Sequence, residues 1–392
     1  MNRIRVLEII SGFAIEGPLG GIERFGIELA QSLDQEIIEP IVCGMWAYGT
    51  PYEYGWVNML NKQGIRAFIA ADWEASSPYK SFIRAYKGTK KQIEPPIDII
   101  HSHCQFGDIL ALLLKRQVGA RALIRTVHNE REWGKRPLRR ILLTGMLFPL
   151  LFDYEFGVAQ RVVDNLDQRF VAKLIRKRSI RAYNALNLAR FENVKVDRSA
   201  KKKQLGIPEN MPVIGTVGRL TEQKGYDIFL KAATIVLQKI PHVYFLLIGG
   251  GDLYNKLKKQ AVDLGIENRV LFTGPRDDVE ELFQIMDVFV NSSLWEGLPT
   301  VMLESMAAQV PVIATNVSGN IELIQHKKTG LLIPPADFEQ LGQTIITILT
   351  TPPDVVQEMC LQANDFVRRH FSIQTIAQQY ATVYSNLTSN NL

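Results

Sequence analysis

The sequence alternates short apolar runs of β type with amphipathic helical stretches along its whole length. In the first half, strands are predicted at 4–10, 38–43, 97–101, 122–127 and 156–159, with intervening helices such as 22–33 and 109–117. In the second half, strands are predicted at 213–217, 243–248, 270–272, 288–291, 310–314 and 331–333, with helices that include 227–239, 279–285 and 338–349. Strands that alternate with helices favour parallel sheets, so the pattern predicts an α/β fold.

The chain is too long for one ordinary hydrophobic core, because it has 392 residues. Two Rossmann-like domains are therefore expected, at 1–195 and 196–370, joined within the polar stretch 192–207. The remaining residues, 371–392, contain a helix at about 373–386 that could cross back to the first domain. Parallel sheets bind ligands at the carboxyl ends of their strands, so the two domains are expected to face each other across a cleft.

Composition excludes several other classes of protein. A hydrophobic content of 46% and a charged content of 22% are those of a globular protein. The cysteines, Cys43, Cys104 and Cys360, are far apart and form no CxxC pair, which favours a reducing cytosol over a disulfide framework or a zinc site. No run approaches the roughly 18 apolar residues that span a bilayer, and the start lacks a signal peptide pattern. A cytoplasmic protein is expected.

The loop after the strand at 213–217 contains two cations beside glycines. Gly218 is followed by Arg219, and Lys224 is followed by Gly225. An arginine can bind phosphate oxygens with two parallel hydrogen bonds, and a lysine acts as a mobile point charge. This loop is therefore a candidate phosphate site, although surface cations in a loop are more often simply solvated.

A second candidate element follows the strand at 288–291. Pro299 stands where a helix would begin, and the free amides at such a start, from Pro299 through Thr300, Val301, Met302 and Leu303, can hold an anion. Glu296 and Glu304 flank this segment, and carboxylates are good acceptors for sugar hydroxyls. A turn at Glu296 and a buried, paired Glu304 would explain the two acids equally well.

Together these residues resemble a known family, the retaining glycosyltransferases of family 4, which have the GT-B architecture. The resemblance depends on Gly218-Arg219, Lys224-Gly225 and the spacing of Glu296 from Glu304. Similar segments occur at 245–251, 272–274, 287–290, 311–315 and 329–331, so the resemblance covers about residues 212–349. The stretch Asn184-Ala185-Leu186-Asn187 departs from the Asn-Gly-x-Asp that is usual in the family.

The resemblance implies a role for each matching position. Arg219 and Lys224 would contact the diphosphate of a nucleotide sugar and stabilise the leaving group. Glu304 would bind the ribose hydroxyls, and Glu296 the transferred sugar. Backbone groups around Pro275 and Arg276 would contact the base. With cations and helix amides in these positions, and no Asp-x-Asp in the chain, no metal and no other cofactor is expected.

Two features of the first half are also candidates. Gly20 and Gly21 precede the helix at 22–33 and could bring backbone amides close to an anion or sugar, although a loop that needs positive φ explains them equally well. The resemblance favours the cleft role and makes His128, at the end of the strand at 122–127, a contact to the donor sugar. A metal site formed by His101, His103 and His128 is a weaker alternative, because no cysteine pair or carboxylate cluster accompanies them.

The net charge of +5 conceals a basic region at 115–181. Within it, the basic stretch 131–140 precedes the apolar stretch 141–152, an arrangement suited to peripheral binding of an anionic membrane. A helix buried between sheet and solvent is the alternative.

The expected function is transfer of a hexose-type sugar, with retention of configuration, from a nucleoside diphosphate donor to a glycan or lipid-linked acceptor. Such an enzyme would serve cell-envelope polysaccharide or glycolipid synthesis, with UDP as the nucleotide on base rates alone. The alternatives are a sugar-nucleotide epimerase or phosphorylase of the same architecture and a non-catalytic sugar-nucleotide-binding protein. A nicotinamide dehydrogenase is disfavoured because Tyr254 replaces the last glycine of GxGxxG. The sequence does not identify the sugar, the acceptor or the oligomeric state.

Overall fold

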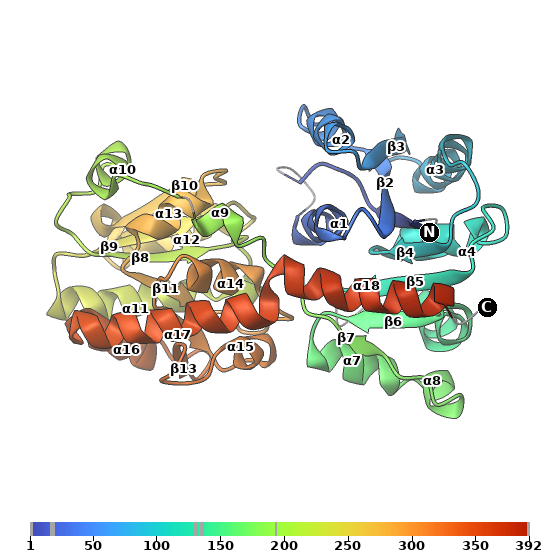
Figure 1. The fold of residues 1–392 in the computed structure, drawn as a ribbon. Helices are drawn as coiled ribbons and strands as arrows, with labels where there is room; N and C mark the ends of the chain where they lie inside the picture. Colours follow the sequence, from blue (N-terminus) through green and yellow to red (C-terminus); the bar gives the residue numbers. More distant parts are fainter. Residues whose placement is uncertain (1–2, 16–19, 129–131, 134–136, 193, 390–392) are drawn as a thin grey trace. The chain divides into compact units, whose positions relative to one another are not determined.

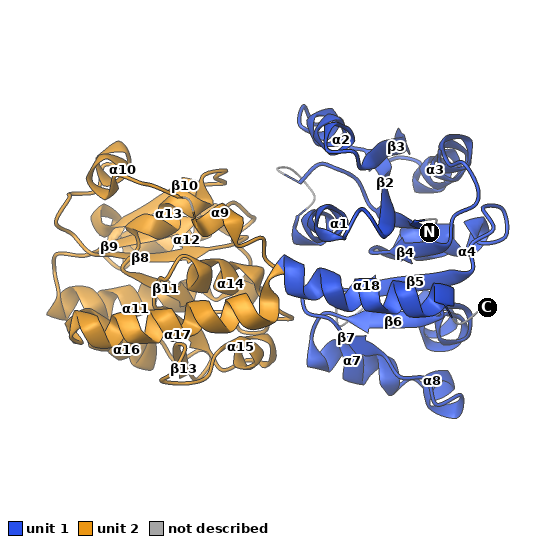
Figure 2. Cartoon of the chain, viewed as in Figure 1, with its two compact units in different colours: residues 1–185, 373–392 blue, residues 186–372 orange. Residues whose placement is uncertain are grey.

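The computed structural model describes residues 3–15, 20–128, 132–133, 137–192 and 194–389 (Figure 1). It divides the chain into two compact units, 1–185 with 373–392, and 186–372 (Figure 2). The first unit therefore ends before the predicted boundary at 195, and the predicted C-terminal helix belongs to it. Each unit is built on one parallel sheet, which confirms the α/β fold with two Rossmann-like domains.

Unit 1 contains a seven-stranded sheet with the order β3-β2-β1-β4-β5-β6-β7. Its strands are β1 (Ile4–Ile10), β2 (Ile38–Ala47), β3 (Arg66–Asp72), β4 (Ile99–Ser102), β5 (Ala122–Val127), β6 (Tyr154–Gly157) and β7 (Ile180–Arg181). Its helices are α1 (Gly21–Ser32), α2 (Glu53–Lys62), α3 (Pro78–Gln92), α4 (Gln105–Leu114), α5 (Pro137–Arg139), a π-helical segment (Arg140–Leu147), α6 (Phe148–Leu151), α7 (Gln160–Asp167), α8 (Phe170–Leu174) and α18 (Ile373–Ser389).

The alternation of side chains along β1 separates the two faces of this sheet. Leu7 and Ile9 pack in a cluster with α3, α4 and α6, whereas Val6 packs in a cluster with α1 and α18. Because side chains of a strand point to opposite faces in turn, Glu8 lies on the same face as Val6. The two strands that the sequence did not predict, β3 and β7, are the edges of the sheet.

Unit 2 contains a six-stranded sheet with the order β10-β9-β8-β11-β12-β13. Its strands are β8 (Val213–Val217), β9 (Tyr244–Ile248), β10 (Val270–Gly274), β11 (Val288–Asn291), β12 (Val312–Thr315) and β13 (Leu331–Ile333). Its helices are α9 (Ala189–Glu192), α10 (Arg198–Gln204), α11 (Tyr226–Lys239), α12 (Tyr254–Asp263), α13 (Val279–Ile285), α14 (Thr300–Ala307), α15 (Ser318–Leu323), α16 (Phe338–Thr350) and α17 (Pro353–Phe371), with 3₁₀ turns at Glu222–Lys224 and Glu267–Arg269.

The order of this second sheet reverses between β8 and β11, which pair in parallel. The loops that follow these two strands therefore leave the sheet at its topological switch point, where open α/β sheets bind ligands. Among the described residues, no helix combines the length and apolar character needed to cross a bilayer.

Candidate functional site

The two candidate loops of unit 2 meet through a buried ion pair. The ammonium of Lys224, after β8, pairs with Oε1 of Glu296, after β11. Glu296 also accepts hydrogen bonds from Ser293 Oγ at 2.6 Å and from Gln223 Nε2 at 3.3 Å. Glu296 is only 6% exposed. Its three donors therefore hold a nearly buried carboxylate in one position. The structure thus brings together two of the predicted catalytic residues.

Two glycines allow these loops to approach so closely. Gly225 has φ +61°, and a Cβ at this position would lie 2.3 Å from the Ser292 carbonyl oxygen. The Ser292 hydroxyl in turn donates to the Lys224 carbonyl oxygen at 2.9 Å. A Cβ on Gly319, in α15, would lie only 1.9 Å from the Gly297 carbonyl oxygen. No larger residue fits at either position without moving the loop that positions Glu296.

Gly218 and Arg219 lie on the same turn as Lys224, at the carboxyl end of β8. The Arg219 side chain is exposed, and the structure gives it no ion pair with any described residue. Lys224 is largely covered, with 18% of its side chain exposed, and is fixed by Glu296. The turn thus presents one free cation and one positioned cation.

Helix α14 begins directly after this loop. Pro299 is its N-cap and Thr300 its first residue, so the helix starts where the proline was expected to open it. Met302 and Leu303 are fully buried, whereas Val301 and Glu304 are half-buried. The amide end of α14 therefore lies one loop away from Glu296, as the predicted anion site requires.

Arg276 follows β10 and is already engaged. Its guanidinium donates to Asp278 Oδ1 at 2.7 Å, and Lys201 pairs with the same carboxylate. These cations lower the pKa of Asp278 to about 2. The side chain of Arg276 is thus a structural ion-pair member. The contact between backbone groups around Pro275 and Arg276 and the nucleotide base stays a prediction.

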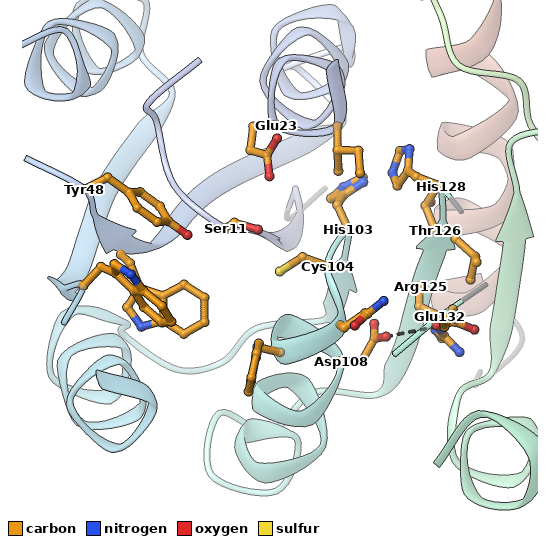
Figure 3. A pocket seen from close by; sticks show the side chains of 16 residues that line it. Ser11, Glu23, Tyr48, His103, Cys104, Asp108, Arg125, Thr126, His128 and Glu132 are labelled. Carbon is orange, nitrogen blue, oxygen red and sulfur yellow. Dashed lines mark hydrogen bonds and ion pairs between the residues drawn. The ribbon is translucent and has the colours of Figure 1, made fainter. Parts of the chain in front are cut away.

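Unit 1 has a pocket of about 330 Å³ at the carboxyl edge of its sheet (Figure 3). One wall is aromatic, with Trp46 and Trp73 ring centroids 4.8 Å apart and Tyr48 6.0 Å from Trp73. In Figure 3 the Tyr48 hydroxyl and the Glu23 carboxylate point toward the middle of the pocket. The pocket is also lined by Phe106, Asp108, Arg125, His128 and Glu132.

His128 reaches this pocket from the end of β5. Its Nδ1 lies 3.0 Å from Asn184 Oδ1, and its Nε2 is buried without a hydrogen-bond partner among the described residues. Burial and the nearby His103 lower the pKa of His128 to about 3, so the ring is neutral. With the proton on Nδ1, where Asn184 accepts it, Nε2 is a bare acceptor for a ligand hydroxyl. Asn184 was missed because β7, the strand before it, was not predicted.

Gly20 and Gly21 lie at the start of α1. Gly20 is the N-cap, and its amide donates to Glu23 Oε2 at 3.1 Å. A Cβ on Gly20 would meet nothing within 4 Å, so space does not require glycine there. Glu23, one turn into the helix, lines the pocket and was not predicted.

The histidines at the end of β4 belong to a buried network with an acid that the sequence analysis overlooked. Glu8 Oε2 lies 2.8 Å from His103 Nε2 and 3.0 Å from His101 Nδ1, and the Tyr384 hydroxyl donates to Glu8 Oε1 at 2.9 Å. Burial opposes ionisation, but the two histidines lower the pKa of Glu8 to about 2.

Glu8, His101 and His103 are the only group within the described ranges that could hold a metal ion. His128, the third ligand of the weaker alternative above, is replaced by Glu8. The ligand atoms of the trio already hydrogen-bond to one another, so they are explained without an ion.

Beneath the pocket, one buried arginine faces three carboxylates. Arg125 lies 3.1 Å from Asp108 and 3.2 Å from Glu155, and it also pairs with Glu132. Burial raises the pKa of Asp108 to about 8, against the opposing charge of Arg125 and with a further contribution from the nearby Glu132. Asp108 is therefore protonated at neutral pH and can donate a hydrogen bond.

Comparison with known proteins identifies related sequences. Residues 197–365 match the family model described as glycosyl transferases group 1. The chain is 27% identical over 318 residues to a UDP-Gal:alpha-D-GlcNAc-diphosphoundecaprenol alpha-1,3-galactosyltransferase from Escherichia coli, covering 79% of this chain and 80% of that protein. It is 34% identical over 194 residues to the lipopolysaccharide core biosynthesis glycosyltransferase LpsE of Rhizobium meliloti, covering 49% and 52% respectively.

Solved structures share the fold. Anabaena Alr3699/HepE in complex with UDP and glucose has a TM-score of 0.78 at 21% identity, over 98% of this chain and all of that one. A sucrose-phosphate synthase from Thermosynechococcus elongatus has a TM-score of 0.78 at 19% identity, over 99% of this chain and 100% of that one. The expected GT-B architecture is confirmed.

Proposed function

We propose that this chain, whose residues 197–365 match the group 1 glycosyl transferases, transfers a hexose-type sugar from a nucleoside diphosphate donor with retention of configuration. The observation that carries the proposal is the Lys224–Glu296 pair at the switch point of the unit 2 sheet, beside the amide end of α14. A diphosphate needs cations and free amides, and a sugar ring needs a fixed carboxylate. The loops after β8 and β11 supply the cations and free amides for the diphosphate and the fixed carboxylate for the sugar.

In this proposal, Arg219 and Lys224 bind the diphosphate. As the bond between the anomeric carbon and the diphosphate oxygen breaks, they stabilise the negative charge that develops on the leaving group. The acceptor hydroxyl attacks from the same face and forms the new glycosidic bond, and its proton passes to the departing phosphate oxygen. Cations and amides do the work of a metal ion, so the transfer is proposed to be metal-independent.

The remaining roles follow from the resemblance and the local geometry. Glu304 binds the ribose, Glu296 binds the transferred sugar, and the backbone near Arg276 contacts the base. His128 Nε2, which has no hydrogen-bond partner among the described residues, is proposed to accept a hydrogen bond from a hydroxyl of the donor sugar. UDP is proposed as the nucleotide, because the E. coli relative takes UDP-Gal by its name and HepE was solved with UDP.

The acceptor is proposed to be a glycan or lipid-linked sugar of the cell envelope. The names of the E. coli and Rhizobium meliloti relatives support this class. The unit 1 pocket suits it, because the aromatic wall of Trp46, Tyr48 and Trp73 can stack on a sugar ring while Glu23 accepts its hydroxyls. We further propose that transfer takes place at a membrane surface.

Incubation with UDP-glucose or UDP-galactose alone tests the donor site. The wild-type protein should release free sugar and UDP slowly. Lys224→Ala should lower that rate at least about a hundredfold, the size of effect seen when one donor to a developing charge is removed. Glu304→Ala should lower it at least about tenfold at subsaturating donor, because the hydrogen bonds between a charged group and the ribose are lost. Lys256→Ala, an exposed lysine of α12, is the matched control. Hydrolysis by both site variants within a few-fold of wild type would overturn the assignment. An isomerised nucleotide sugar instead would indicate the epimerase alternative.

A further inference from the structure

Exposed apolar side chains are concentrated in two short segments of unit 1. The first runs through α5, the π-helical segment and α6, and the second is α8 with the residue after it. Leu138 is 81% exposed, Phe170 79% and Leu174 71%. Together the two segments contribute ten such residues, named here the docking face: Leu138, Ile141, Leu142, Met146, Leu147, Leu150, Leu151, Phe170, Leu174 and Ile175. Single exposed apolar residues are ordinary, but such a concentration indicates an interaction surface.

The first segment is amphipathic in the structure. Thr144 and Phe148 face inward and are buried, and Phe148 packs under the Arg125 guanidinium at 4.6 Å from the ring centroid. Phe152 is also buried. The two phenylalanines of the apolar stretch 141–152 therefore belong to the core and do not contribute to the exposed side. Ile141, Met146 and the leucines other than Leu143 form the exposed side, and Phe170 of the other segment supplies the aromatic ring.

Hydrogen bonds hold the two segments together. Arg169, at the start of α8, donates from Nη1 to the Thr144 carbonyl oxygen at 2.8 Å. Lys177, just after α8, donates from Nζ to the Pro149 carbonyl oxygen at 2.9 Å. α8 also lies against both the π-helical segment and α6. The docking face is therefore a single, internally braced surface.

Exposed cations lie in the same two segments as this surface. Arg140 in the first segment and Lys173, Arg176 and Arg178 in the second are exposed. The last three, with Lys177, line a hollow of about 660 Å³ that also contains Asp164 and Asp167. A contiguous apolar face bordered by lysine and arginine complements the anionic headgroups and the acyl boundary of a bilayer.

The docking face begins at the rim of the unit 1 pocket. The Arg139 guanidinium lies 5.8 Å from the centroid of a Trp133 ring, and Trp133 lies 5.7 Å from Phe106, which lines the pocket. We propose that the docking face inserts into the headgroup region of an anionic bilayer and so presents the pocket to a lipid-linked acceptor. The acceptor part rests on the proposed function, whereas the membrane binding does not.

Vesicle sedimentation of the full chain tests the binding. Wild-type protein should bind vesicles of phosphatidylcholine with one third phosphatidylglycerol at least about tenfold more tightly than pure phosphatidylcholine, and 1 M salt should weaken this binding. Arg140→Glu/Lys173→Glu should lower it at least tenfold, and Leu142→Ser/Phe170→Ser should abolish it. The controls are Lys256→Glu/Lys259→Glu and Val355→Ser/Leu361→Ser, exposed residues of unit 2 that should bind as wild type.

Donor hydrolysis without vesicles should be unchanged in all four variants, which separates this proposal from the donor-site assignment. Failure of the wild type to bind anionic vesicles, or equal binding by docking and control variants, would overturn it. So would a loss of dimers by Leu142→Ser/Phe170→Ser in light scattering, which would assign the face to a second copy of the chain.

Discussion

At the scale of single residues, Lys224 has a structural and a chemical function that can be separated. It neutralises Glu296, which is nearly buried. Lys224→Met should therefore leave an unpaired buried carboxylate and lower the free energy of unfolding by about 2 kcal/mol. Adding Glu296→Gln should restore at least half of that loss, because no charge remains to be compensated, while donor hydrolysis stays at least a hundredfold down.

Circular dichroism during urea unfolding gives the stabilities, and Lys256→Met is the control. If the double variant recovered activity together with stability, Lys224 would be a purely structural residue.

The residue scale is also where sequence reasoning was incomplete. It proposed Lys224 and Glu296 from the two loops that follow strands, and His128 from the family resemblance. Sequence reasoning missed Glu8, Glu23 and Asn184. Only strand pairing and side-chain packing bring these residues to the unit 1 pocket and to the histidines beside it.

At the scale of elements, the approach of the β8 and β11 loops depends on Gly225. Gly225 and Gly265 both have positive φ, +61° and +69°, but a Cβ would clash only at Gly225. Gly265→Ala should lower the free energy of unfolding by about 1 kcal/mol through backbone strain alone. Gly225→Ala should lower it by roughly 1–3 kcal/mol more and reduce donor hydrolysis at least tenfold, because the Ser292 loop must move.

Thermal unfolding and product release by the two variants provide the comparison, and equal effects would show that close approach is unimportant. Element prediction from the sequence succeeded for the central strands and for both edge strands of unit 2, β10 and β13. β1, β5, β8 and β11 have the predicted bounds, since both their faces are largely buried and most of their residues are apolar. Edge strands β3 and β7 were missed, because β3 is alanine-rich and half-buried and β7 has only two residues.

At the scale of the whole molecule, buried titratable groups of unit 1 should determine its pH stability. Burial lowers the pKa of His103 to about 4 and of His128 to about 3, so the unfolded chain binds more protons below pH 6.5 and stability falls with acid. Burial raises the pKa of Asp108 to about 8, so the folded chain holds an extra proton and stability falls as pH rises toward 8. The unfolding free energy of unit 1 should be greatest near pH 6.5.

Tryptophan fluorescence can follow this unit alone in a Trp295→Phe background, since the other four tryptophans, Trp46, Trp56, Trp73 and Trp133, lie in unit 1. Asp108→Asn, which mimics the protonated acid, should abolish the decline between pH 6.5 and 8 and leave the acid limb in place. An alkaline decline that persists in the asparagine variant would show that another group causes it.

The chain leaves unit 1 at residue 185 and returns to it only at residue 373. Tyr384, on the returning helix, donates the hydrogen bond to Glu8, and Tyr380 packs against Phe156 with ring centroids 4.4 Å apart. During synthesis, residues 1–185 therefore emerge well before the helix that completes their unit, while the contiguous residues 186–372 can fold in between. Loss of α18 would leave Glu8 and His101 without their tyrosine partner, so a truncation after unit 2 would disturb β1 and β4.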